Sequence, residues 1–248
     1  MNSFESFKKS PIRCIKYKNY FDVYDNVLLD FVGKQITVVE IGVAAGGSLH
    51  MWRDFFGKKA RIIGIDFNPE AKLLEKDGYE IFIGNQGDVN FWKNFYSSVG
   101  NIDILIDDGG HTYIQQIITI ESSLNFINDG GLILTEDSHS SYLPDFGYKK
   151  FSLIEYSKKM IDKINARYPD IQNDALNDNI WSIEFFQSFV IFKINRKNIG
   201  KSGEFIENNS NKYHDATDFR YKDIRLRFKF IKTLIINLKT YLSLRKYF

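Results

Sequence analysis

The sequence predicts an α/β fold built on a doubly wound, mostly parallel sheet of seven strands that ends in an antiparallel hairpin. Short apolar runs typical of buried strands alternate with amphipathic helical patterns, and this alternation indicates a parallel sheet with helices on both faces. The last two apolar runs leave no room for a helix between them, which indicates a hairpin at one edge of the sheet. With 248 residues, 44% of them hydrophobic, the chain is long enough to fill the core of such a domain.

The predicted elements follow one another in the order of a Rossmann-like domain. Residues 1–33 are expected to form a helical cap, because the apolar residues between Tyr20 and Phe31 recur at helical spacing. Strands are expected at 36–41, 61–66, 80–84, 102–107, 131–135, 180–186 and 188–195. Helices are expected at 48–56, 69–76, 89–97, 113–127 and 147–168.

The C-terminal part of the chain differs in composition. Between Arg220 and Phe248 there are nine Lys or Arg residues and one acid, Asp223, which gives a local charge of +8. In helical register one face carries Ile231, Leu234, Ile235, Leu238 and Leu242, and the adjacent basic stripe carries Arg225, Lys229, Lys232, Lys239 and Lys246. A basic amphipathic helix of this kind either packs on a protein surface or lies on an anionic membrane. We therefore expect a cap at 1–33, a ligand-binding domain at 34–198, and a linker with the basic tail at 199–248.

The composition argues against several classes of protein. The net charge of the whole chain is +2, which gives no reason to expect a nucleic-acid partner. Cys14 is the only cysteine, so neither an internal disulfide nor a thiolate zinc cluster is expected. The sequence shows no apolar run long enough to span a membrane and no signal-peptide pattern. We therefore expect a cytoplasmic protein, with peripheral contact to the inner membrane face through residues 220–248 left open.

The most informative motif runs from Glu40 to Ser48. An expected buried strand ends there in an acid and a glycine-rich turn, Glu40-Ile41-Gly42-Val43-Ala44-Ala45-Gly46-Gly47-Ser48, and a helical pattern follows. Glycines let a ligand approach the backbone, and the helix N-terminus presents amide groups to it. Dinucleotide-binding enzymes place their acid about 20 residues after the glycines. Here Glu40 precedes them, which suits a cationic ligand such as the amino group of S-adenosylmethionine.

Acids also stand at the ends of the second and third expected strands, and ligands of open α/β sheets bind outside such ends. Asp66 ends the second strand, where it is well placed to accept hydrogen bonds from the two ribose hydroxyls of an adenosine. Asp88 follows the third strand and either faces an adenine edge or caps the next helix. The capping role is open for Asp66 as well.

The fourth and fifth expected strands each end in a pair of acids followed by a histidine. The two segments are Asp107-Asp108-Gly109-Gly110-His111 and Glu136-Asp137-Ser138-His139. Neighbouring strands bring their acids to one edge of the sheet, where the carboxylates destabilise one another unless a cation neutralises them. Hard oxygen ligands in this number favour Mg²⁺, Mn²⁺ or Ca²⁺. The sequence therefore predicts a divalent metal site at this edge.

Taken together, these motifs resemble the metal-dependent sugar O-methyltransferases of macrolide biosynthesis and their cephalosporin-hydroxylase-like bacterial relatives. These proteins belong to the class I S-adenosylmethionine-dependent methyltransferases. The matching segments are Glu40–Arg53, Gly64–Asp66, Ile106–His111, Gly130–Leu132 and Glu136–Tyr142. The resemblance covers about residues 15–195, is weak in the cap and does not include the basic tail. It implies that residues 34–198 form an S-adenosylmethionine-binding methyltransferase domain.

The resemblance also implies roles for individual residues. The metal ligands of the family correspond to Asp108, Glu136 and Asp137, and its general base corresponds to His111. His139, at the other strand end, is a further catalytic candidate. The residues expected at the cofactor are Glu40, Gly42, Gly46, Ser48, Asp66, Asp88 and Asp107.

The resulting hypothesis is an S-adenosylmethionine-dependent O-methyltransferase acting on a sugar hydroxyl. Mg²⁺ or Mn²⁺ would lower the pKa of that hydroxyl, and His111 would take its proton. One alternative is a non-haem Fe(II) oxygenase that uses His111, His139 and a carboxylate as metal ligands. Another is a non-catalytic scaffold that docks at a membrane through the basic tail.

The expected partners follow from this hypothesis. The acceptor is expected to contain a sugar, either in a small molecule or linked to a nucleotide or a lipid, as in the synthesis of surface polysaccharides. A homo-oligomer is also expected.

Overall fold

The computed structural model describes residues 2–165, 179–198, 208 and 229–244. The chain divides into two compact units, residues 1–202 and 203–248. The first contains the sheet and helices α1 to α6, and the second contains α7. The structure does not test the predicted boundary between the cap (1–33) and the domain (34–198). Aromatic residues of the cap share a hydrophobic core with the sheet.

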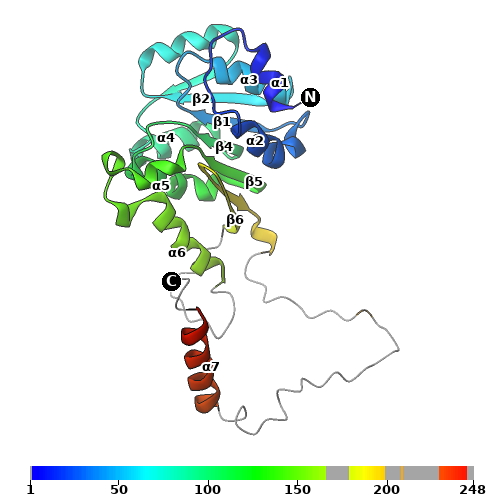
Figure 1. Ribbon diagram of the computed structural model, residues 1–248. Coiled ribbons are helices and arrows are strands. Elements are labelled where there is room, and N and C mark those ends of the chain that lie inside the picture. Colours follow the sequence, from blue (N-terminus) through cyan, green and yellow to red (C-terminus); the bar gives the residue numbers. More distant parts are fainter. Residues whose placement is uncertain (1, 166–178, 199–207, 209–228, 245–248) are drawn as a thin grey trace. The chain divides into compact units, whose positions relative to one another are not determined.

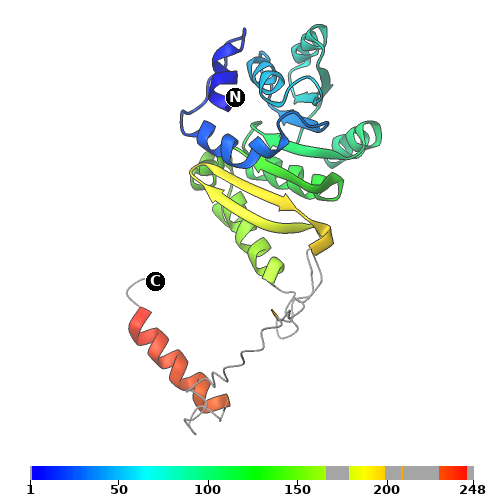
Figure 2. The ribbon, with the colours of Figure 1, turned by 90° about the vertical axis from the view of Figure 1, so that its right-hand side faces the viewer.

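The first unit is built on a seven-stranded sheet with the strand order β3-β2-β1-β4-β5-β7-β6 (Figure 1). The strands are β1 (Thr37–Ile41), β2 (Arg61–Asp66), β3 (Glu80–Ile83), β4 (Ile102–Asp107), β5 (Ile127–Thr135), β6 (Ile180–Phe186) and β7 (Phe189–Ile194). The first five strands are parallel, whereas β7 pairs antiparallel with both β5 and β6. This topology confirms the predicted Rossmann-like sheet and its terminal hairpin, the yellow pair of strands in Figure 2.

Helices cover both faces of this sheet. They are α1 (Ser3–Lys9), α2 (Tyr20–Leu28), α3 (Gly47–Phe56), α4 (Val89–Val99), α5 (Tyr113–Ser123) and α6 (Leu153–Asn165). On one face, buried side chains of α2 and α3 form a core with strand residues such as Val38. On the other face, α4, α5 and α6 form a second core with residues such as Val39. Val38 and Val39 are neighbours in β1 and point to opposite faces, which is why a central parallel strand reads as a continuous apolar run.

Four predicted helical regions differ from the observed ones. The helix expected at 69–76 is a 3₁₀ helix, Pro69–Asp77, and the helix expected at 113–127 ends at Ser123, so that β5 begins at Ile127 instead of 131.

The helix expected at 147–168 is replaced at its start by a 3₁₀ turn at Lys149–Phe151, and α6 spans only Leu153–Asn165. Residues 166–168 of that prediction lie outside the described part of the chain. The expected N-terminal cap consists of α1 and α2 separated by the non-helical residues 10–19. Pro11 lies just past the end of α1 and has no amide hydrogen to donate, so it does not extend the helix.

The second unit contains α7 (Lys229–Leu244). Four residues of the predicted apolar face, Ile231, Leu234, Leu238 and Leu242, are exposed. Of the predicted basic stripe, Arg225 and Lys246 lie outside the described residues, as do the side chains of Lys229, Lys232 and Lys239. None of the helices that the structure describes is long and apolar enough to cross a membrane.

Candidate active site

Three loops meet at the carboxyl ends of β1, β4 and β5, in the middle of the sheet. The amide of Asp108 donates to the carbonyl oxygen of Ile41 (3.1 Å), and the amide of Glu136 donates to that of Asp107 (2.9 Å). Gly42 lies against this junction with φ +85°, and a Cβ there would overlap with the backbone of Asp108. Only glycine fits such a position. The glycine loop (residues 42–48) thereby contacts the backbone of Asp108 after β4, which is joined in turn to the segment after β5.

Asp108, His111 and Asp137 face one another at this junction. Each offers one ligand atom, and the three atoms lie within 4.8 Å of one another. His111 Nε2 lies 3.8 Å from Asp108 Oδ1 and 3.6 Å from Asp137 Oδ2. Together with Glu136 we call these residues the acid cluster. Two carboxylate oxygens and an imidazole nitrogen at these separations can surround one small cation.

The backbone is strained at two residues of the acid cluster. His111 and Asp137 have φ values of 57° and 51°, in the left-handed region that non-glycine residues rarely adopt. Strain of this kind persists where the surrounding structure enforces it, and it is concentrated at functional sites. At His111 the next residue, Thr112, caps α5 in a capping box with Gln115, which fixes the turn.

Glu136 is fully buried and is held by the N-terminal region of the chain. Its Oε1 accepts a hydrogen bond from the Tyr24 hydroxyl (2.7 Å), and its Oε2 accepts one from the ammonium of Lys16 (2.8 Å). The same ammonium lies 2.5 Å from Asp108 Oδ2. One lysine therefore joins the acids after β4 and β5.

Tyr20, from the same N-terminal region, donates a hydrogen bond to Asp137. The sequence pattern gave Tyr20 and Tyr24 only an apolar role and gave Lys16 none. These three residues lie more than 90 residues before their partners in the chain. For Tyr20 and Tyr24, the hydroxyl at the end of the ring was the only available signal, and it does not identify a partner.

The charges of the acid cluster are only partly balanced. Burial raises the pKa of Glu136 to about 8, even though the Lys16 ammonium opposes the shift. Burial by itself lowers the pKa of Lys16, but Glu136, Tyr24 and Asp108 together raise it well above its ordinary value. Lys16 is therefore a charged ammonium in contact with two carboxyl groups, those of Asp108 and Glu136, and Asp137 is left for a further cation.

The glycine loop joins β1 to α3. Gly46 precedes the helix with φ +87°. Ser48 Oγ donates to Glu40 Oε2 (2.7 Å), and Trp52 Nε1 donates to Glu40 Oε1 (3.0 Å). The Glu40 carboxyl is fully buried beneath the loop, and burial raises its pKa to about 7. Glu40 thus supports the loop from behind, with a donor already on each oxygen.

Two adjacent cavities open at the junction. One, of about 310 Å³, is lined by the glycine loop, except for Gly46, and by residues 13–16. The other, of about 260 Å³, is lined by Asp108, Glu136 and Asp137 together with residues 15–17 and Tyr20. Ile15, Lys16 and Asp108 line both cavities. We call the first the loop cavity and the second the acid cavity.

Asp66 and Asp88, at the ends of the second and third strands, bond mainly to neighbouring backbone. Asp66 Oδ2 accepts from the amide of Ala44 in the glycine loop (2.9 Å), and Oδ1 accepts from the amide of Asn68 (2.8 Å). Asp88 caps α4 by accepting a hydrogen bond from the amide of Asn90 (2.8 Å). Asp88 therefore acts as a helix cap, one of the two roles expected for it. A contact of Asp66 or Asp88 with a cofactor stays a prediction.

The remaining predicted residues are Asp107 and His139. Asp107 is buried, Oδ1 accepts from Gln86 Nε2 (2.8 Å) and from the amide of Gly109 (3.2 Å), and burial raises its pKa. Its Oδ2 has no hydrogen-bond partner among the described residues. His139 is exposed, with Nδ1 3.1 Å from Ser188 Oγ. Neither residue belongs to the set of three that the structure brings together.

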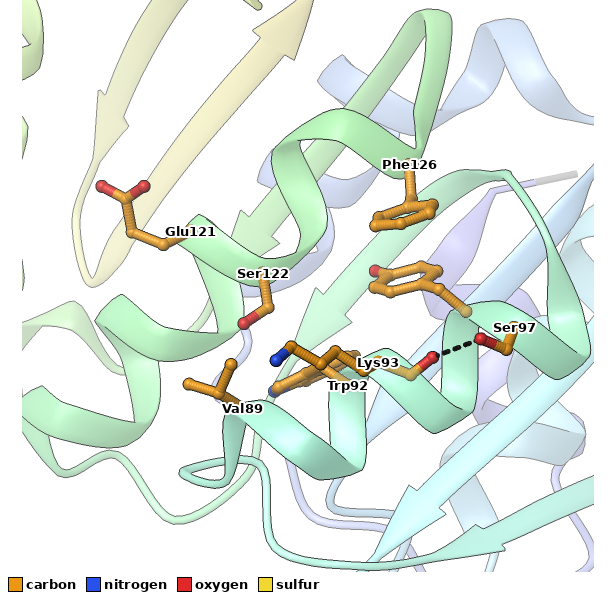
Figure 3. A pocket seen from close by; sticks show the side chains of 8 residues that line it. Val89, Trp92, Lys93, Ser97, Glu121, Ser122 and Phe126 are labelled. Atoms are coloured by element: carbon orange, nitrogen blue, oxygen red, sulfur yellow. Dashed lines mark hydrogen bonds between the residues drawn. The ribbon is translucent and has the colours of Figure 1, made fainter.

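A larger cavity of about 510 Å³ lies elsewhere, between α4 and α5 (Figure 3). Its wall includes Trp92, Lys93 and Glu121, and Phe126 stacks on the ring of Tyr96 at 4.1 Å between centroids. None of the predicted site residues lines it. Size alone therefore does not identify the functional site in this protein.

Comparison with known proteins relates the chain to methyltransferases. Residues 39–138 match the family model of a methyltransferase domain. The chain is 30% identical over 162 residues to the 8-demethyl-8-alpha-L-rhamnosyl tetracenomycin-C 2'-O-methyltransferase of Streptomyces olivaceus, a match that covers 60% of this chain and 42% of that protein. It is 32% identical over 131 residues to the mycinamicin VI 2''-O-methyltransferase of Micromonospora griseorubida, covering 50% and 32%. The chain thus spans less than half the length of these curated relatives.

Among solved structures, the MycE methyltransferase from the mycinamycin biosynthetic pathway, in complex with Mg and SAH, superposes with a TM-score of 0.73 at 24% identity. The match covers 85% of this chain and 58% of that one. This likeness shows a shared fold. The family model and the curated relatives confirm the family resemblance that the motifs predicted.

Proposed function

We propose that this chain, a class I methyltransferase related to the macrolide and tetracenomycin sugar O-methyltransferases, transfers a methyl group from S-adenosylmethionine to a sugar hydroxyl with a divalent metal ion. The observation that carries the proposal is that the loop cavity and the acid cavity share Ile15, Lys16 and Asp108 as a common wall. Methyl transfer requires its two substrates to meet in line at short range, and two adjoining cavities can supply that arrangement.

The glycine loop supports the cofactor part of the proposal. Gly42 and Ser48 line the loop cavity, and the N-terminus of α3 begins within the same loop. Asp66 is fixed beside the loop by the amide of Ala44, where its free lone pairs would accept the ribose hydroxyls. Glu40 would act through Ser48, by holding the loop from behind. Gly46, Asp88 and Asp107 remain proposed cofactor contacts from their places in the motifs.

The acid cluster supports the metal part of the proposal. The Lys16 ammonium contacts both Asp108 and Glu136, and this pairing supports a site whose carboxylates favour a cation. Asp108, Glu136 and Asp137 would hold Mg²⁺ or Mn²⁺ through the oxygen ligands that these ions prefer. When bound, the metal would lower the pKa of an acceptor hydroxyl.

His111 is the proposed general base. Its Nε2 faces the oxygens of Asp108 and Asp137, so it lies within reach of a hydroxyl placed in the acid cavity. It would take the hydroxyl proton while the sugar oxygen bonds to the methyl carbon and the carbon–sulfur bond breaks, leaving S-adenosylhomocysteine. His139 lies beside Ser188, with Nδ1 3.9 Å from Asp137 Oδ1, and is the second proposed catalytic residue.

The described residues favour this proposal over the Fe(II) oxygenase. The set of three that they bring together contains one histidine and two carboxylates. The facial triad of the oxygenases contains two histidines and one carboxylate.

Methyl transfer from labelled S-adenosylmethionine to a panel of rhamnosides and nucleotide sugars tests the proposal. We expect transfer in Mg²⁺, loss of transfer in EDTA and recovery when Mg²⁺ is restored. Transfer that persists unchanged in EDTA would contradict the metal role. Turnover that requires Fe(II) and O₂ would contradict the methyltransferase reaction itself.

The basic tail supports a finer proposal, that the acceptor belongs to surface-polysaccharide synthesis at a membrane. The exposed apolar residues of α7 and the charge of +8 between Arg220 and Phe248 suit an anionic lipid surface. Co-sedimentation of the full chain with phosphatidylglycerol vesicles, but not with phosphatidylcholine vesicles, is the expected result. Equal recovery with both, or with neither, would contradict it. We also propose that the chain forms a homo-oligomer, and light scattering would measure its molar mass in solution.

A further inference from the structure

The segment between α1 and α2, which we call the N-terminal strap (residues 10–19), lies over the glycine loop. Ser10 Oγ donates a hydrogen bond to the carbonyl oxygen of Gly47 (2.8 Å). A Cβ at Gly47 would lie 2.8 Å from the carbonyl oxygen of Arg13, so the strap touches the loop backbone directly. Residues 13–16 of the strap form one wall of the loop cavity.

The strap inserts one side chain into the acid cluster. Lys16 reaches inward until only 4% of its side chain is exposed, and its ammonium lies 2.5 Å from Asp108 Oδ2 and 2.8 Å from Glu136 Oε2. The strap carries a second lysine, Lys18, which is exposed. Burial of an ammonium is costly unless carboxylates surround it, and burial of these carboxylates is costly without a cation. Lys16 and the two acids therefore depend on each other.

The position of Lys16 conflicts with a loaded metal site. A Mg²⁺ ion binds carboxylate oxygens at about 2.0–2.1 Å and requires near-octahedral coordination. Asp108 and Glu136 are two of the three acids proposed to hold it, and each already has an oxygen facing the Lys16 ammonium. Asp108 Oδ1 and Asp137 Oδ2 face His111 and are not the oxygens that Lys16 contacts. The competition therefore concerns Glu136, whose two oxygens accept from Tyr24 and Lys16. A divalent ion at this site also repels the nearby ammonium, and it has the larger charge.

We propose that Lys16 is the resident cation of this site, and that a divalent metal ion replaces it and thereby releases the N-terminal strap from the loop cavity. This inference rests on the metal-dependent reading of the proposed function. It assigns Lys16 as a positioning residue. Without metal, its ammonium pairs with Asp108 and Glu136, and its side chain forms part of the wall between the two cavities. Metal binding and access to the loop cavity are then linked, because the same ten-residue strap carries Lys16 and covers the glycine loop.

Cys14 gives a direct readout of the strap. It is the only cysteine of the chain, is half-buried, and lines the loop cavity two residues before Lys16. We expect its rate of alkylation by iodoacetamide to rise about tenfold or more when Mg²⁺ or Mn²⁺ replaces EDTA, because release of the strap exposes the thiol. In Lys16→Met, which keeps the apolar stem, the rate is expected to be high in EDTA and nearly independent of metal.

Metal affinity is the second readout. Calorimetric titration with Mn²⁺ alone is expected to show binding about tenfold or more tighter in Lys16→Met than in the natural chain, because an opposing charge at hydrogen-bond distance has been removed. The matched control is Lys18→Ala, on the exposed side of the same strap, which is expected to change neither the affinity nor the alkylation rate. If Lys16→Met is poorly folded in EDTA, Mn²⁺ is expected to raise its thermal midpoint more than that of the natural chain.

The outcomes separate this inference from the proposed function. The exchange would be overturned, with a metal site left in place, by either of two results. One is equal Mn²⁺ affinity in the natural chain and Lys16→Met, and the other is an alkylation rate of Cys14 in the natural chain that does not change with metal. Mn²⁺ binding to neither chain would overturn the exchange and the metal part of the proposed function together.

Discussion

The acids at the ends of β1, β2 and β3 are held differently from those at the ends of β4 and β5. Glu40, Asp66 and Asp88 accept hydrogen bonds from side chains and amides close to them along the chain or in the adjoining glycine loop. Asp108 and Asp137 instead face each other, His111, and donors from the distant N-terminal region.

The difference shows what a strand-end carboxylate can do. Glu40 and Asp88, which are engaged by donors of their own neighbourhood, mainly fix a loop or a helix end, whereas Asp66 keeps lone pairs for the ribose hydroxyls. Acids that are crowded together, with partners supplied from elsewhere in the chain, retain affinity for a cation. We therefore expect substitutions of Asp108 and Asp137 to affect chemistry, and those of Glu40 and Asp88 to affect mainly stability.

The largest expected effect comes from Asp108→Asn. Asparagine keeps the shape of the side chain but removes a charged metal ligand that lies in the wall of both cavities. Since metal assistance is worth several kcal/mol in the transition state, turnover should fall by about a thousandfold or more. Calorimetric titration with Mn²⁺ measures the loss of metal affinity, and the methyl-transfer assay measures the loss of turnover. Asp88→Asn is the matched control in the other group, and loss of metal binding there would break the comparison.

His111→Ala is expected to have the next largest effect. Removal of a general base lowers the rate by about 10²–10⁴-fold. Affinity for S-adenosylhomocysteine should be nearly unchanged, because His111 does not line the loop cavity. A rate assay with a calorimetric binding measurement separates the two quantities. A comparable loss of cofactor binding would contradict the role assigned to His111.

Glu40→Gln is expected to change the pH dependence of stability. Burial raises the folded-state pKa of Glu40 to about 7 from its ordinary value of 4.5, so the folded chain holds its proton more tightly than the unfolded chain. The stability linked to this proton is fully present below pH 4.5 and is lost as the pH rises through about 7. The natural chain should therefore lose about 2–4 kcal/mol more than the variant between these limits.

Chemical denaturation of both chains at a series of pH values measures this difference. Parallel curves would show that Glu40 does not titrate as described. A large loss of cofactor affinity in the variant would place Glu40 in direct contact with the ligand and would weaken the division between the two groups.

The smallest expected effect is that of Asp88→Ala. Loss of the hydrogen bond to the Asn90 amide at the start of α4 should lower the free energy of unfolding by about 0.5–2 kcal/mol. Asp88→Asn, which can still cap the helix, should keep most of that stability. If Asp88 instead faces an adenine, affinity for S-adenosylhomocysteine will fall in both variants, and this binding measurement decides between the two roles.

The sequence allowed the sheet to be predicted because its signals are local. Apolar runs, the glycine loop and the strand-end acids each lie within a few residues, and the parallel order brings β4 next to β5. That arrangement was enough to predict that the acids and histidines after β4 and β5 share one edge of the sheet, and ligand atoms of Asp108, His111 and Asp137 lie within 4.8 Å of one another there.

The rest of the site depends on contacts that are distant in sequence. Lys16, Tyr20 and Tyr24 meet their acids across more than 90 residues, and no periodic pattern reports such pairs. The burial of Glu40 was also missed, because the motif suggests a ligand, whereas the donor that encloses the carboxyl is Trp52, one helix further on. Packing around a motif decides whether its acid is available.

The central claim is that the glycine loop and the acid cluster form one methyltransferase site. Calorimetric titration of the full chain with S-adenosylhomocysteine in the presence of Mg²⁺, with NADH as the control ligand, tests it most directly. The account predicts micromolar binding of S-adenosylhomocysteine and none of NADH. Binding of NADH, or of neither ligand, would contradict it.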